Sequence, residues 1–217
     1  MVQKDQARPR GRPRAYDAEQ ALAQARDAFW QAGFAATSLD DVSAATKMNR
    51  PSLYAAFGDK RALYLSLLDR YTAAADQAIA REFDAEQPLA KALTRFYQHA
   101  LSLYLPAEGA ARGCFLIGTA VSEAAADAQV REKLGQALGG FSSALEKRLR
   151  RAQAQGEIDA TADAAGLAGI ASAVLHSLAV RSRAGDSRAS LNAMIGTAVR
   201  LICGDAAPGR NSKRQGS

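Results

Sequence analysis

The sequence predicts an all-α protein of about nine helices. Alanine is abundant, and no segment alternates apolar and polar residues with the period of a strand. Helix-breaking residues are confined to short stretches near residue 88 and at 106–113, 156–163 and 185–186. Hydrophobic residues fill 48% of the 217 positions, enough for a substantial core. Three helices are expected before residue 60, followed by helices over 60–83, 88–105, 113–125, 127–155, 163–184 and 187–203.

The second and third helices are marked by their capping residues. The Ser38 hydroxyl can cap the second helix, and Asp40 and Asp41 occupy its first turn, where the helix dipole favours negative charge. Asn49 can cap the third helix, and Pro51 fits in its first turn because the N–H that proline lacks would be unpaired there. A tight corner is therefore expected just before Asn49.

The third helix has a buried face and an outward face. Leu53 and Phe57 are four residues apart and can pack together, and Met48 in the corner is expected to point inward. An arginine can pair bidentately with guanine, and hydroxyl groups can reach phosphates or bases. This arrangement is typical of a DNA-reading helix-turn-helix, although a solvated face on a small helical hairpin is the alternative. The outward residues are Arg50, Ser52, Tyr54 and Ala55.

The segment from Tyr16 to Tyr71 resembles the N-terminal domain of the TetR family of transcriptional regulators. Residues 25–37 correspond to the family pattern A..LF...G(F/Y).(A/G)T, and residues 53–63 correspond to LY..F..K.(A/E)L. Lys47 departs from the pattern, because the family commonly has glycine there. The resemblance implies a helix-turn-helix DNA-binding domain over 17–62 and a helical effector-binding and dimerisation domain over 63–204.

The resemblance also implies DNA contacts at particular positions. Lys47 would add a further phosphate contact, and ordinary packing and solvation are the alternative for Tyr54 and Lys60. The implied phosphate contacts are Thr37, Ser38, Tyr54 and Lys60, and the implied base contacts are Arg50, Pro51 and Ser52.

The positive charge is concentrated at the two ends of the chain. The net charge is +6, but residues 1–16 carry five basic residues against one acid, and residues 208–217 carry three basic residues and no acid. Arg8 to Arg14 reads RPRGRPR and resembles an AT-hook, so Arg10, Arg12 and Arg14 of this flexible arm are expected to enter a minor groove. The alternative is a solubilising basic tail. Residues 205–217 are expected to be a disordered basic tail.

The last two helices are expected to form a homodimer interface as a four-helix bundle. A two-fold dimer presents its recognition helices to successive major grooves, which implies a palindromic operator. The alternative is that these apolar stripes only close the core of the monomer. The predicted interface residues are Leu167, Ile170, Val174 and Leu178, then Leu191, Met194, Ile195, Ala198 and Leu201.

The middle helices carry aromatic and polar residues that can line a cavity for a small-molecule effector, although most of them also fit a plain core. The segment RGCFLIGTAVSEA at 112–124 resembles the start of the sixth helix in some TetR subfamilies. A cation near Cys114 would favour its thiolate, and Arg112 is close in sequence, but a buried, inert cysteine is the alternative. The candidate effector-binding residues are Phe96, Tyr97, His99, Tyr104, Cys114, Phe115, Ile117 and Phe141.

Other classes of protein find little support in the sequence. There is no phosphate-binding glycine loop, no HExxH and no GxSxG motif, so we expect no catalytic residues, no metal and no cofactor. No run approaches a membrane span and no signal peptide is evident, which indicates a cytoplasmic protein with no membrane partner. We expect a sequence-specific DNA-binding regulator, a repressor relieved by an unknown small-molecule effector. The alternatives are a helical-bundle carrier or enzyme with a vestigial DNA-binding unit, or an architectural protein for A·T-rich DNA.

Overall fold

The computed structural model describes residues 17–204, and within that range it contains nine α-helices and no strand. The all-α prediction is confirmed, and the six helices predicted from residue 60 onward have observed ends within two residues of the predicted ones. The helices are α1 (Ala18–Ala32), α2 (Leu39–Thr46), α3 (Arg50–Phe57), α4 (Lys60–Asp84), α5 (Leu89–Tyr104), α6 (Phe115–Glu123), α7 (Ala128–Ala154), α8 (Ala164–Arg183) and α9 (Arg188–Cys203).

Short-range capping explains why the helix starts could be predicted. Seven of the nine helices begin after a residue whose side-chain oxygen accepts a hydrogen bond from a backbone amide of the first turn. The other two, α5 and α6, follow Pro88 and Cys114 and have no side-chain cap. The capping residues are Asp17, Ser38, Asn49, Asp59, Asp127, Asp163 and Ser187.

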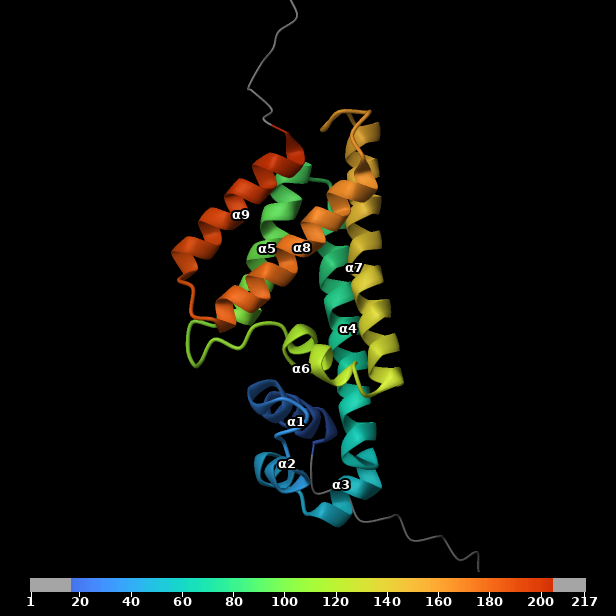
Figure 1. Cartoon of the computed structure of the whole chain (residues 1–217), viewed down its shortest axis with the longest axis vertical. Helices are drawn as coiled ribbons and strands as arrows, with labels where there is room; N and C mark the ends of the chain where they lie inside the picture. Colours follow the sequence, from blue (N-terminus) through green and yellow to red (C-terminus); the bar gives the residue numbers. More distant parts are fainter. Residues whose placement is uncertain (1–16, 205–217) are drawn as a thin grey trace, which may run out of the picture.

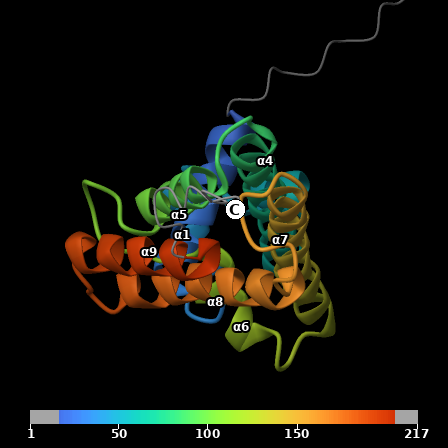
Figure 2. The ribbon, with the colours of Figure 1, turned by 90° about the horizontal axis from the view of Figure 1, so that it is seen from above.

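The nine helices form an elongated body with a small unit at one end (Figure 1). Helices α1, α2 and α3 lie together at that end, and the long helix α4 runs from them alongside α7. At the other end α5, α8 and α9 pack on one another, and Figure 2 shows α8 and α9 side by side when the molecule is seen from above. Helix α6 contacts both α1 and α8, so it lies between the two ends.

A continuous core joins the N-terminal unit to the rest of the protein. Phe29 and Trp30 of α1 are buried, and their rings lie 5.4 Å from Tyr64 of α4 and 5.6 Å from Phe115 of α6, respectively. Phe115 is itself fully buried. The predicted boundary between the DNA-binding domain and the effector-binding domain, at residues 62 and 63, falls inside α4. The core is continuous across this boundary, so the boundary stays a prediction.

Helix α8 corrects the expectation that no run of residues approaches a membrane span. Its 20 residues include an 18-residue window of mean hydropathy 1.4, so by length and composition it is apolar enough to span a bilayer. The same composition suits a helix packed within a bundle, because small residues such as Ala168 and Ala171 let neighbouring helices approach closely. Helix α8 packs against α5, α6, α7 and α9.

Candidate nucleic-acid interface

The start of α2 is fixed by a reciprocal pair of hydrogen bonds. The Ser38 hydroxyl oxygen accepts from the Asp41 backbone N–H at 3.1 Å, and the Asp41 carboxylate accepts from the Ser38 backbone N–H at 2.7 Å. The same carboxylate accepts from the Ser38 hydroxyl at 2.6 Å, and these bonds lower the pKa of Asp41. Ser38 is exposed and remains a candidate phosphate contact.

The corner between α2 and α3 is built on a left-handed residue. Lys47 has φ 56° and ψ 23°, a region in which most L-residues are strained and glycine is not. Met48 follows and is buried, which confirms that it points inward. The Ser43 hydroxyl donates to the Met48 carbonyl at 2.5 Å and so ties the corner to α2. A lysine therefore occupies the backbone position that suits glycine, and its side chain is exposed.

Helix α3 presents its first turn to solvent. The Asn49 side chain accepts from the Ser52 N–H at 2.9 Å, and Leu53 is buried beneath the helix. Arg50 and Pro51 are exposed, Ser52 is half-buried, and Tyr54 is 52% exposed. These four side chains lie on the outer part of one short helix whose position is set by the corner and by Leu53.

Arg50 is engaged by a neighbouring carboxylate. Its Nε and Nη2 atoms donate to the two carboxylate oxygens of Asp40 at 2.6 Å and 2.5 Å. Both side chains are more than half exposed. The pair raises the pKa of Arg50 and holds the guanidinium fork at the junction of α2 and α3.

Two of the implied phosphate contacts have other roles in the structure. Thr37 is buried, and its hydroxyl donates to the Gly33 carbonyl at 2.7 Å. Its side chain therefore closes the turn between α1 and α2, and this bond leaves the hydroxyl little access to a phosphate. Lys60 is half-buried with its Nζ 4.3 Å from the centre of the Phe34 ring, a cation–π contact that fixes the start of α4. The predicted arm contacts Arg10, Arg12 and Arg14 lie outside the described residues.

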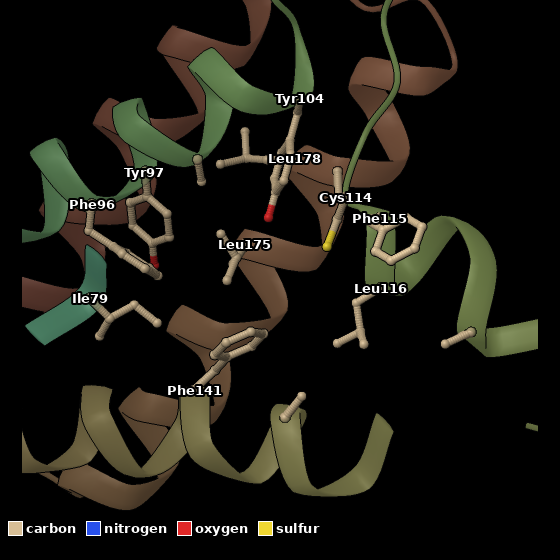
Figure 3. Close-up of a cluster of buried hydrophobic side chains, with 14 of the residues drawn as sticks. Ile79, Phe96, Tyr97, Tyr104, Cys114, Phe115, Leu116, Phe141, Leu175 and Leu178 are labelled. Atoms are coloured by element: carbon tan, nitrogen blue, oxygen red, sulfur yellow. The ribbon is translucent and has the colours of Figure 1, made fainter. Parts of the chain in front are cut away.

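A cavity of about 300 Å³ lies between α1, α4, α5 and the segment before α6. Five of the eight candidate effector residues line it: Phe96, His99, Tyr104, Cys114 and Phe141. Figure 3 shows the Tyr104 hydroxyl and the Cys114 sulfur pointing into the space bounded by Phe96, Leu175 and Phe141. Sequence reasoning missed Trp30 and Tyr71, which come from segments far apart in the chain. Arg112, noted in the sequence as a neighbour of Cys114, also lines the cavity.

Three candidate effector residues do not line this cavity. Tyr97 is buried and donates to the Ala171 carbonyl at 2.9 Å, so it joins α5 to α8. Phe115 belongs to the aromatic core, within 5.5 Å of the Tyr71 ring centre. Ile117 lines a separate depression between α6 and α8. Effector contacts by these three residues stay a prediction, and they are not supported by the lining of this cavity.

The inner wall of the cavity carries neutral hydrogen-bonding groups. The Tyr71 hydroxyl lies 3.3 Å from the Cys114 sulfur. Burial raises the pKa of Tyr71 and of Tyr104 well above the ordinary phenol value, so both remain protonated at neutral pH. Cys114 is buried as a free thiol.

The same wall is linked to the DNA-binding unit. The Trp30 indole N–H lies 3.1 Å from the Gly113 carbonyl and 3.2 Å from the Arg112 carbonyl, both of which can accept from it. From the end of α8, Arg183 donates to the Trp30 carbonyl and to the Gln31 carbonyl, each at 3.3 Å. Trp30 therefore belongs to α1, lines the cavity and is held by α8.

The predicted dimer residues separate into a buried and an exposed group. Leu178, Leu191, Ile195 and Ala198 are buried within the protomer, so they offer little surface to a second copy, and their place at an interface stays a prediction. Leu167, Val174 and Met194 are partly buried. Ile170 and Leu201 are 57% and 75% exposed, and Val180, which was not predicted, is 57% exposed. Ile170 and Val180 on α8 and Leu201 on α9 are therefore exposed apolar side chains, which we call the exposed apolar residues of α8 and α9.

Two family models match this chain. Residues 21–67 match the bacterial regulatory proteins of the tetR family, and residues 88–197 match the tetracyclin repressor-like C-terminal domain. The second match covers half of the sequence. The chain belongs to the TetR family.

Individual relatives agree with this assignment of the TetR-family chain. It is 31% identical over 193 residues to the HTH-type transcriptional repressor ComR of Escherichia coli K12, covering 88% of this chain and 91% of ComR. It is 36% identical over 117 residues to the repressor BdcR of the same organism, covering 54% of this chain and 59% of BdcR. Among solved structures, a cysteine mutant of the TetR family regulator CifR bound to 26-bp operator DNA has a TM-score of 0.76 at 30% identity. That likeness covers 88% of this chain and 98% of CifR.

The predicted family, fold and general function are confirmed. The TetR-family chain is a DNA-binding transcriptional regulator, and its nucleic-acid partner is double-stranded DNA.

Proposed function

We propose that this TetR-family chain is a homodimeric repressor that reads a palindromic operator with the first turn of α3. The observation that carries the proposal is the outward first turn of α3. There Arg50, Pro51 and Tyr54 are exposed and Ser52 is half-buried, and the Lys47 corner and the Asn49 cap fix the position of the helix. A short helix fixed at its N-terminal turn can enter a major groove with that turn against the base edges. The named relatives ComR and BdcR are repressors, which favours repression here.

The residues of this face have separate roles. Arg50 reads a guanine, Pro51 and Ser52 contact neighbouring base edges, and Tyr54 binds a phosphate. The exposed Ser38 and Lys47 bind phosphates on either side of the groove. The arm over residues 1–16 adds a minor-groove and salt-dependent contribution, because its charge is strongly positive while that of residues 17–207 is close to neutral.

Dimerisation uses the exposed apolar residues of α8 and α9. Ile170, Val180 and Leu201 are large apolar side chains that a protomer in water leaves uncovered at a cost in free energy. A second copy of α8 and α9 packed on these residues would form a four-helix bundle and place two copies of α3 for two half-sites.

The cavity is the effector site of the proposed repressor, which acts in the cytoplasm. It is lined by Arg26 and Trp30 of α1, so a bound molecule contacts the DNA-binding unit itself. A ligand that fits one placement of α1 better than another shifts the protein toward that placement and changes DNA affinity.

The test is selection of bound sequences from a random double-stranded DNA pool with the purified full chain, at two salt concentrations. We expect a palindrome with half-sites about one helical turn apart that is retained at the higher salt. The matched Arg50→Ala protein should lose preference at one base position in each half-site. Enrichment of A·T-rich DNA that vanishes with salt would support the architectural alternative. No enrichment would support a carrier or enzyme.

A further inference from the structure

The cavity has an uneven distribution of charge. Three arginines line it, Arg26, Arg81 and Arg112. Among the described residues, Glu82 is the one acid that lines it, and Glu82 already accepts from the Arg95 guanidinium at 2.8 Å. Positive groups around the cavity therefore exceed the negative groups available to neutralise them.

Two of these arginines lie beside Trp30. The Arg26 and Arg112 guanidinium groups approach the same Asp27 oxygen, at 3.0 Å and 3.5 Å. Both also lie against the Trp30 ring, with their guanidinium carbons 5.6 Å and 4.1 Å from its centre. One carboxylate serves two cations, which leaves about one positive charge uncompensated at this wall.

Hydrogen-bonding side chains line the cavity as well. The phenols of Tyr71 and Tyr104 and the thiol of Cys114 line the same cavity. Phenol O–H groups and a guanidinium together can satisfy the several lone pairs of a carboxylate. The rest of the lining is apolar and includes Phe141 and Leu175.

We propose that the cavity binds an apolar organic acid, with its carboxylate at the wall formed by Arg112, Tyr71 and Tyr104 and its hydrocarbon body against Phe141 and Leu175. This inference rests on the proposed function in taking the cavity as the effector site. A cavity of about 300 Å³ suits a small molecule, since such sites span roughly 300–1,000 Å³. The uncompensated guanidinium favours an anion over a neutral or cationic head group of the same size.

The chain provides its own probe for the test. Trp30 is the single tryptophan of the sequence and lines the cavity, so its fluorescence reports occupancy directly. The purified full chain, without DNA, is titrated with 4-phenylbutanoate, with its neutral amide 4-phenylbutanamide, and with 4-phenylbutylamine. These probes share one hydrocarbon body and differ in head group.

We expect the acid to bind about tenfold more tightly than the amide, because a charge-assisted hydrogen bond is stronger than a neutral one, and the amine to bind most weakly. Arg112→Gln should reduce the affinity for the acid to that for the amide and leave the affinity for the amide unchanged. The matched control Arg81→Gln removes the same charge at the rim and should change the affinity for the acid less than about threefold.

Equal binding of acid and amide, tighter binding of the amine, or no change in Trp30 fluorescence with any probe would overturn the inference. A larger loss in Arg81→Gln than in Arg112→Gln would overturn the placement of the carboxylate. Failure of the proposed function is seen separately. If the chain binds the acid more tightly than the amide but selects no DNA sequence, the organic-acid inference stands and the proposed repressor function is wrong. If the chain selects a palindrome but binds acid and amide equally, the repressor function stands and the organic-acid inference is wrong.

Discussion

The guanidinium of Arg50 and the carboxylate of Asp40 form a two-pronged ion pair across the corner of the helix-turn-helix, at 2.6 Å and 2.5 Å. Arg50, the side chain proposed to read a base, is therefore bound to Asp40 when DNA is absent. Both partners are more than half exposed, so water screens their attraction and the pair can open readily. A guanine can replace the carboxylate because it offers the same fork two acceptors, O6 and N7.

Asp40→Asn should strengthen operator binding, because it removes a competitor for Arg50. It also removes a negative charge near the phosphates, which strengthens binding of any DNA. A double-mutant cycle with Arg50→Ala separates these effects, with dissociation constants measured by fluorescence anisotropy on the selected operator. The gain from Asp40→Asn should be severalfold larger when Arg50 is present. Equal gains in both backgrounds would show that Asp40 does not compete for Arg50.

Arg50→Ala alone should weaken operator binding by about 10- to 100-fold and affect unrelated DNA much less. The same anisotropy assay with operators altered at each position identifies the base that Arg50 reads. A uniform loss across all altered operators would place Arg50 on a phosphate.

Lys47 allows backbone strain to be separated from charge. Lys47→Gly should raise the free energy of unfolding by about 0.5–1 kcal/mol, because glycine adopts a φ of 56° without strain, whereas Lys47→Ala should change it little. Both variants remove the same charge, so both should weaken DNA binding and reduce the salt slope by about one. Urea denaturation and binding at several salt concentrations measure the two effects. Equal stabilities of the glycine and alanine variants would contradict the strain at this corner.

The helices could be predicted closely because their signals are local. Ser38, Asn49 and Asp163 cap helices within three residues of their own position, and Met48 is the large apolar residue of a tight corner. Leu191 shows what the sequence leaves open. The spacing of apolar residues along a helix shows which face is buried, but it does not show whether that face packs against the same chain or a second copy. Leu191 is buried within its own protomer.

The sequence predicted some of the residues that line the cavity and missed others, because only some of them follow from a local pattern. Phe96 and Tyr104 lie on the same helix at helical spacing, so the sequence pattern predicts that they share a face. Trp30 and Tyr71 reach the cavity from α1 and α4 through tertiary packing, and no short-range pattern reports such a meeting. Thr37 matched the family pattern, but the same residue type serves equally well as a buried hydroxyl bonded to Gly33.

Gly113 is expected to be intolerant of a side chain. It has φ +63°, and a Cβ there would lie 2.6 Å from the Ala179 carbonyl oxygen. Gly113→Ala should lower the free energy of unfolding by about 2–4 kcal/mol through strain and overlap. Gly109→Ala is the matched control, because Gly109 also has positive φ but no atom lies within 4 Å of its Cβ position, and it should cost about 1 kcal/mol. Equal losses in urea denaturation would show that the α6 segment can move away from α8.

Arg183 is expected to transmit effector binding to the DNA-binding unit. It extends from the end of α8 to the carbonyls of Trp30 and Gln31, which lie in the last turn of α1, where a cation is favoured. Arg183→Gln should leave operator affinity without ligand within about threefold of the parent chain. It should reduce the factor by which a saturating effector weakens operator binding, because α1 is no longer held to α8 when the cavity fills.

Arg181→Gln is the matched control for Arg183→Gln. Arg181 lies on the same last turn of α8 but pairs with Asp186 at 3.0 Å, so its loss should leave the coupling factor unchanged. Operator affinity measured with and without 4-phenylbutanoate gives that factor for each chain. If both variants kept the coupling factor of the parent chain, the effect of ligand binding would be transmitted to α3 through α4 and not through the end of α1. Helix α4 also lines the cavity and adjoins the helix-turn-helix.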